Sequence, residues 1–127
     1  MPYTNIDTAE ARDFGLATDR QADLDDITVS IVTIHQTHSL KEALAGLPNG
    51  QCHCPHWGYL LKGRVTVEYT DRTEAYGPGD AFYMTPGHVP AAEAGSEFVM
   101  FSPRDELFAT NKAVEEHMCQ LMAAGTG

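Results

Sequence analysis

The sequence is poor in basic residues: 8 lysines and arginines stand against 18 aspartates and glutamates among 127 residues, for a formal net charge of −10. Binding to nucleic acid depends largely on cationic side chains that neutralise phosphates. We therefore expect no nucleic-acid partner. The acidic excess is concentrated at the start of the chain, where residues 1–26 contain seven acids and two arginines. We interpret this segment as a solvated acidic N-terminal arm.

The sequence also lacks long apolar runs and has only three cysteines. No stretch reaches the length that crosses a bilayer, and the chain begins with acidic residues in place of a basic segment followed by an apolar one. We expect no membrane partner and a cytoplasmic location. Cys52 and Cys54 are two residues apart, a spacing at which an extended backbone disfavours an unstrained disulfide. Free thiols or metal ligands in a reducing compartment fit better.

Short β-branched and aromatic runs separated by turn residues occupy the middle of the chain. The run from Ile27 to His35 alternates apolar and polar side chains with the period of a strand. Further runs follow at Cys52 to Lys62, Arg64 to Thr70, Ala81 to Met84 and Glu97 to Phe101. Short strands at this spacing are typical of a β-sandwich or barrel.

Two helices are predicted beside these strands. Ser39 or Thr37 can cap a short helix from Leu40 to Leu44. A second helix is predicted from Pro103 onward, with Ser102 as its N-cap and an apolar stripe along one face. We expect this C-terminal helix, within residues 103–127, to pack on the strands or on a second subunit. The stripe and the N-terminal arm both favour a homodimer.

The segment from Gly50 to Gly63 (GQCHCPHWGYLLKG) carries the most chemical information. If it is extended, Cys52, Cys54 and His56 share one face, whereas His53 points to the other. A β-bulge at Pro55 would reverse this and bring His53 into the pocket in place of Cys54. Thiolate and imidazole ligands favour zinc, iron or copper over magnesium or calcium.

This segment, together with Gly77 to His88 (GPGDAFYMTPGH), resembles the two motifs of the cupin family. The first cupin motif has two histidines two residues apart, a glutamate, and a glycine after six further residues, and the second ends in a Pro-Gly turn and a histidine. Aligning Gly63 with the first motif's glycine places His56 at the glutamate position and Cys52 or Cys54 at that of the second histidine. His88 matches the histidine of the second motif. The resemblance covers about Ser30 to Pro103. It implies that His88 faces the strand that carries Cys52, Cys54 and His56.

The resemblance implies an all-β fold, an antiparallel cupin-type β-barrel or jelly roll over residues 27–102. The residue patterns described above add the short inserted helix and the C-terminal helix to this fold. The predicted metal ligands are Cys52, Cys54, His56 and His88, and the cofactor is a divalent transition metal. Zinc is favoured over iron, because the facial triad that binds iron needs a carboxylate. Tyr59 and Tyr83 are predicted to orient a small organic ligand at the mouth of the barrel.

The resulting hypothesis is a metal-dependent enzyme that acts on a small organic molecule by isomerisation, cyclisation, decarboxylation or dioxygenation. No catalytic residue can be named from the sequence. The alternative is a non-catalytic module that binds a small molecule or a metal, since a fold does not determine function. A third hypothesis is a structural ion enclosed by four protein ligands, whereas three ligands and a water would indicate an open site.

Overall fold

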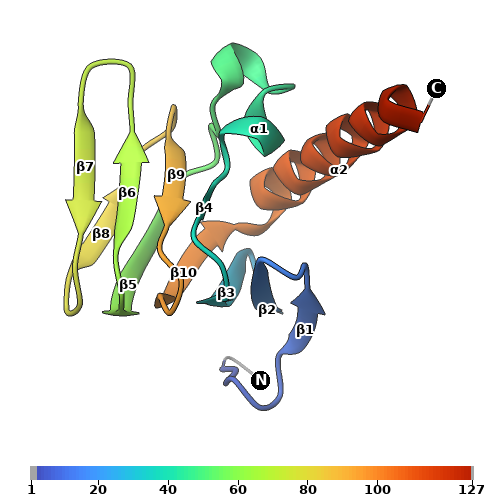
Figure 1. Cartoon of the computed structure of the whole chain (residues 1–127). Helices are drawn as coiled ribbons and strands as arrows, with labels where there is room; N and C mark the ends of the chain where they lie inside the picture. Colours follow the sequence, from blue (N-terminus) through green and yellow to red (C-terminus); the bar gives the residue numbers. More distant parts are fainter. Residues whose placement is uncertain (1–2, 127) are drawn as a thin grey trace.

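Two antiparallel sheets face each other in the computed structural model, which describes residues 3–126 and side chains up to Ala123 (Figure 1). The six-stranded sheet has the order β1 (Glu10–Asp13), β2 (Ala17–Leu24), β3 (Ile27–Ile34), β10 (Glu97–Pro103), β5 (His56–Lys62) and β8 (Ala81–Met84). The four-stranded sheet has the order β4 (His38–Ser39), β9 (Val89–Ala92), β6 (Val65–Glu68) and β7 (Thr73–Tyr76). This is a jelly-roll arrangement, as predicted.

The two sheets do not close into a barrel. Among the described residues, no pairing between named strands joins one sheet to the other, so the expected closed barrel is corrected to an open sandwich. The core lies between the sheets and is built by side chains that alternate inward along each strand. Its buried members are Val32, Ile34, Leu60, Val65, Val67, Tyr76, Phe82, Met84 and Phe98.

The acidic N-terminal segment differs from the solvated arm that we expected. Its strands β1 and β2 extend the six-stranded sheet, and β2 pairs with β3 along its whole length, from Ala17 opposite Ile34 to Leu24 opposite Ile27. Strand β2 alternates small and polar side chains, so it lacks the alternation of apolar and polar residues that predicts a strand. Pairing with β3 supplies the backbone hydrogen bonds that an isolated acidic segment lacks. Residues 1 and 2 of the predicted arm lie outside the described residues.

Both predicted helices are present, but the second begins differently. Helix α1 spans Lys41–Leu44 and is followed by the single-turn helix η1 at Pro48–Gly50. Helix α2 spans Arg104–Thr126, and Gly127 of the predicted helical segment lies outside the described residues. Pro103 is the last residue of β10, so Ser102 belongs to a strand and is not an N-cap. Within residues 3–126, no helix combines the length and apolar composition that a membrane span needs.

The first turn of α2 closes one end of the sandwich. Leu107 packs with Leu44 of α1 and with Cys52 and Cys54 in a second, smaller apolar cluster. Beyond this contact, α2 extends away from the sheets (Figure 1). The smaller cluster positions the segment before β5, which carries the two cysteines.

Candidate metal centre

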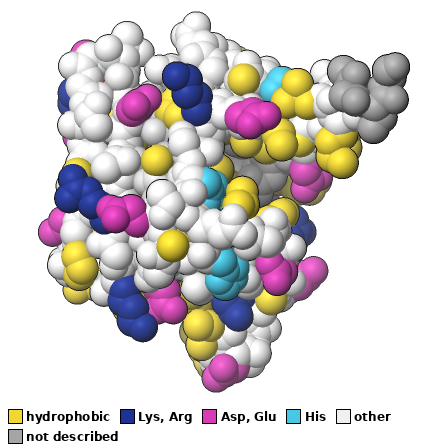
Figure 2. Space-filling model, in the orientation of Figure 1, with side chains coloured by type: hydrophobic (Ala, Val, Ile, Leu, Met, Phe, Trp, Pro, Cys, Tyr) yellow, Lys and Arg dark blue, Asp and Glu magenta, His cyan; other side chains and the backbone are white. Residues whose placement is uncertain are grey.

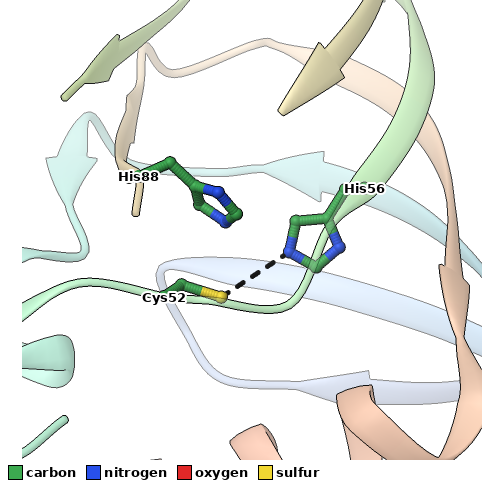
Figure 3. A group of neighbouring side chains, drawn as sticks. All are labelled: Cys52, His56 and His88. Carbon is green, nitrogen blue, oxygen red and sulfur yellow. Dashed lines mark hydrogen bonds between the residues drawn. The ribbon is translucent and has the colours of Figure 1, made fainter. Parts of the chain in front are cut away.

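Three side chains from different parts of the chain meet at this end of the sandwich: Cys52, His56 and His88 (Figure 3). One ligand atom from each lies within 4.8 Å of the others, and all three residues are buried. Cys52 Sγ is 3.8 Å from His56 Nε2. The rings of His56 and His88 have centroids 5.0 Å apart.

Backbone hydrogen bonds hold Cys52 and His88 directly opposite each other. The Cys52 N–H donates to the His88 carbonyl at 2.9 Å, and the His88 N–H donates to the Cys52 carbonyl at 3.1 Å. Before His88, the chain turns at Pro86-Gly87, where Gly87 has a φ of 95°, a conformation that favours glycine. The Pro86-Gly87 turn therefore places His88 opposite Cys52, in agreement with the second cupin motif.

The His88 imidazole has one nitrogen bonded and one without a partner. Its Nδ1 is 2.7 Å from the Thr85 carbonyl oxygen, which can only accept, so Nδ1 carries the proton. Nε2 is then an acceptor. It is buried and has no hydrogen-bond partner among the described residues. A buried polar atom without a partner is costly, and this lone pair is therefore available to a ligand.

His56 begins β5 and points into the sandwich. Its Nδ1 is hydrogen-bonded to the Ser102 hydroxyl of β10 at 2.6 Å, and its Nε2 faces Cys52. Ser102 is fully buried, with 0% of its surface exposed. Sequence analysis assigned this serine to the wrong element. Extending the predicted last strand by one residue would have placed Ser102 beside His56, because Phe101 pairs with Trp57.

Burial keeps all three groups uncharged in the absence of an ion. It lowers the pKa of His56 to about 3, with a further contribution from His88, and it also lowers the pKa of His88. Burial raises the pKa of the Cys52 thiol above its ordinary value. Neutral imidazole is already the metal-binding form, whereas the thiol has to lose its proton when a metal binds.

Cys54 and His53 lie outside this group. The segment from Gln51 to Pro55 is not a continuous strand, since Cys52 forms an isolated bridge and Cys54 sits at a bend. Cys54 consequently packs in the apolar cluster with Leu107, and burial raises its pKa to about 12. His53 is exposed and its Nε2 donates to the Pro48 carbonyl at 2.9 Å. We expected Cys52, Cys54 and His56 to share one face of an extended segment. Cys52 and His56 do lie together, but the chain bends at Cys54 and is not extended there.

Tyr59 and Tyr83 lie on the outer face of the six-stranded sheet. Their side chains are 44% and 46% exposed, and Tyr83 stacks on Trp57 with ring centroids 4.8 Å apart. His56 lies on the inner face of the same strand as Tyr59, three residues earlier. Tyr59 therefore points away from the metal group, and the role of the two tyrosines in orienting a small organic ligand stays a prediction.

The three side chains form a donor set that fits a tetrahedral transition metal. Zinc binds cysteine sulfur at about 2.3 Å and histidine nitrogen at about 2.0 to 2.1 Å, so tetrahedral ligands lie about 3.5 Å apart. The 3.8 Å separation between Cys52 Sγ and His56 Nε2 is close to this value. No carboxylate belongs to the group. Three protein ligands would leave a further position of a bound ion to solvent or a small molecule.

A surface cavity of about 320 Å³ lies near this group without including it. Its lining contains Gln51 and Val89, which flank Cys52 and His88 in sequence, together with Lys41, Glu68 and Tyr69. None of the three metal-centre side chains lines this cavity. The buried group and the surface cavity are thus separate features.

Comparison with solved structures identifies proteins of the same fold. The polyketide cyclase RemF of Streptomyces resistomycificus superposes with a TM-score of 0.61 at 19% identity, covering 81% of this chain and 79% of RemF. A cupin-superfamily sugar phosphate isomerase from Silicibacter pomeroyi gives a TM-score of 0.59 at 11% identity, covering 80% of this chain and 75% of the isomerase.

A third similar structure is the HEPD protein of Streptomyces albus, solved with Fe(II) and its substrate 2-hydroxyethylphosphonate. It superposes with a TM-score of 0.56 at 18% identity, covering 76% of this chain and 24% of that protein. No family model and no curated protein sequence matches this chain. At these identities the similarity establishes the fold alone.

Proposed function

We propose that this chain, a small protein of the cupin fold, binds one divalent transition metal through Cys52, His56 and His88 and acts on a small organic molecule. The observation that carries the proposal is the buried Nε2 of His88, which has no hydrogen-bond partner in the described part of the chain and lies in one group with His56 and Cys52. Zinc suits this thiol and imidazole set better than iron, whose facial triad contains a carboxylate.

Each ligand has a distinct structural role in the proposed centre. Cys52 provides the anionic ligand, and its backbone pairing with His88 holds the two residues directly opposite each other. His88 is oriented through its Nδ1 proton by the Thr85 carbonyl. A bound zinc ion would supply Lewis acidity to a small molecule at its fourth position.

We favour non-oxidative chemistry, of the isomerase, cyclase or decarboxylase type, over dioxygenation. The group lacks the carboxylate typical of iron oxygenases. Two proteins of similar fold are a polyketide cyclase and a sugar phosphate isomerase, whereas HEPD contains Fe(II). The proposed reaction type therefore rests on which atoms can bind the metal. The fold provides only the framework that holds these atoms.

Metal analysis of the protein, purified without an affinity tag, tests the proposal. We expect about one zinc per chain in the wild type and a large loss in Cys52→Ser and His88→Ala. His53→Ala is the matched control, since this exposed histidine lies on the same segment and should leave the metal content unchanged. Wild-type protein that takes up no zinc, iron or copper would contradict the proposal.

X-ray absorption spectroscopy then separates an open site from a closed one. One sulfur and two nitrogen ligands, with a light atom in the fourth position, would indicate an open site that can bind substrate. Two sulfur ligands would mean that Cys54 moves from its cluster to close the site, as a structural ion requires. We expect one sulfur, because Cys52 and not Cys54 belongs to the group whose ligand atoms lie within 4.8 Å of one another.

The alternative function is a non-catalytic module that binds a metal or a small molecule. Its support is the absence of any Asp or Glu from the metal group within the described residues, which leaves the centre without a carboxylate general acid or base. Turnover distinguishes the two. A zinc-loaded protein that binds small cyclic polyketides or sugar phosphates without converting them would favour the binding module.

We further propose a homodimer. Phe108, Leu121 and Met122 of α2 are exposed, and hydrophobic side chains are visible along this helix at the right of Figure 2. Leu107 and Val114, by contrast, pack against the smaller cluster. A second copy would cover the exposed part of the helix. Light scattering at about 20 μM should give twice the chain mass, and a monomer at that concentration would contradict the proposal.

A further inference from the structure

A row of polar side chains crosses the inner face of the six-stranded sheet and ends at His56. Asp23 of β2 is opposite Thr28 of β3, and Thr28 is opposite Ser102 of β10. Ser102 in turn is hydrogen-bonded to His56 of β5 at 2.6 Å. Thr28 and Ser102 are buried. Four strands therefore contribute one polar residue each to a single line, in a sheet whose inner face is otherwise largely apolar.

The direction of the hydrogen bond between Ser102 and His56 determines what His56 can bind. If Nδ1–H donates to the hydroxyl, Nε2 has a free lone pair and can accept a metal. If the hydroxyl donates to Nδ1, the proton is on Nε2 and blocks that position. The two states have the same heavy-atom positions, so the choice depends on the surrounding groups.

One contact favours the first direction. The thiol of Cys52, whose sulfur lies 3.8 Å from His56 Nε2, can donate its proton to an Nε2 that carries none. At the other end of the row, the Thr28 hydroxyl donates to the Asp23 carboxylate at 2.7 Å. Because a hydroxyl has one proton, Thr28 cannot donate to Ser102 as well.

We propose that Ser102 is a positioning residue that holds the neutral His56 ring with its proton on Nδ1. Ser102 thus directs the Nε2 lone pair towards Cys52 and His88. The orientation itself is a property of the metal-free protein. Its consequence for metal affinity rests on the proposed function.

Nitrogen-15 NMR of the imidazole rings in metal-free protein at pH 7.5 measures the orientation directly. In the wild type we expect both His56 and His88 to carry the proton on Nδ1. Ser102→Ala should shift His56 towards the Nε2–H form and leave His88 unchanged. Ser30→Ala is the matched control, because Ser30 is another buried serine on the inner face of this sheet, opposite Met100. Circular dichroism establishes that each variant is folded.

Zinc titration of the same variants measures the consequence. Removal of a residue that orients a ligand typically lowers metal affinity by about 10- to 100-fold. We expect a loss in this range for Ser102→Ala and none for Ser30→Ala. Ser102→Thr keeps the hydroxyl and should retain most of the affinity. A purely structural role would instead give equal changes in the two alanine variants.

The outcomes separate the two proposals. A wild-type His56 with its proton on Nε2, or a Ser102→Ala variant with an unchanged His56 signal, would overturn the positioning role whether or not zinc binds. Wild-type protein with the expected His56 signal but no zinc binding would overturn the proposed function and leave the positioning role supported.

Discussion

Zinc affinity is expected to rise about tenfold for each pH unit between pH 6 and pH 8. Across this range His56 is neutral in the folded protein, because burial lowers its pKa to about 3, and burial also favours neutral His88 by lowering the pKa of that ring. The Cys52 thiol is protonated, because burial raises its pKa above its ordinary value. Zinc must therefore displace one proton per ion. Over two pH units the gain is about 100-fold, or about 2.7 kcal/mol of binding free energy.

Competition with a chromophoric chelator gives the affinity at each pH. Calorimetry in two buffers of different ionisation enthalpy counts the released protons independently. In His88→Ala the affinity should be lower with the same dependence on pH, because the remaining thiol still loses its proton. In Cys52→Ser the dependence should nearly vanish, since serine does not ionise in this range.

Three results would refute this reasoning. An affinity independent of pH in the wild type would mean that no thiol binds the ion. A hundredfold rise per pH unit between pH 7 and 8 would mean that Cys54 also loses a proton. A zinc affinity that falls more steeply below about pH 6.5 would mean that the histidines titrate at their ordinary pKa values. Burial would then not control their protonation.

Three further predictions concern the stability of the fold, each measured as the free energy of unfolding in urea. Gly63→Ala should lose about 2 kcal/mol or more, because Gly63 has a φ of 84° and a Cβ there would lie 2.5 Å from Ser96 Cα. Gly15→Ala, with a φ of 81° and open space around it, should lose only about 1 kcal/mol. Leu60→Ala should lose about 2 to 5 kcal/mol, since this side chain is 0% exposed in the core. The metal-free protein should lose stability as the pH falls below 6.5, by up to about 1.4 kcal/mol per pH unit, because unfolded His56 gains a proton there and the folded form does so only near pH 3. Equal values for the two glycine variants, a Leu60→Ala loss below about 1 kcal/mol, or a stability unchanged between pH 7 and pH 5 would contradict these expectations in turn.

Local sequence patterns were sufficient for much of the fold. The alternation in Ile27–Ile34, the Pro86-Gly87 turn and the two helical segments all appear in the structure. These features depend on nearest-neighbour conformational preferences, which a single sequence carries. Strand β2 was not predicted, because its residues alternate too weakly and its stability comes from pairing with β3. The open sandwich likewise depends on which strands pair, and pairing is a long-range property.

The sequence by itself identified Cys52, Cys54, His56 and His88 as candidate ligands, through their residue types and the Pro-Gly turn before His88. Only the tertiary structure decided that Cys54 leaves this group, because the bend before Pro55 turns its thiol into the cluster with Leu107. It also decided that Ser102 contacts His56, a contact between residues 46 positions apart. Both depend on how distant segments pack around a buried site, where each polar atom must find a partner or remain available to a ligand.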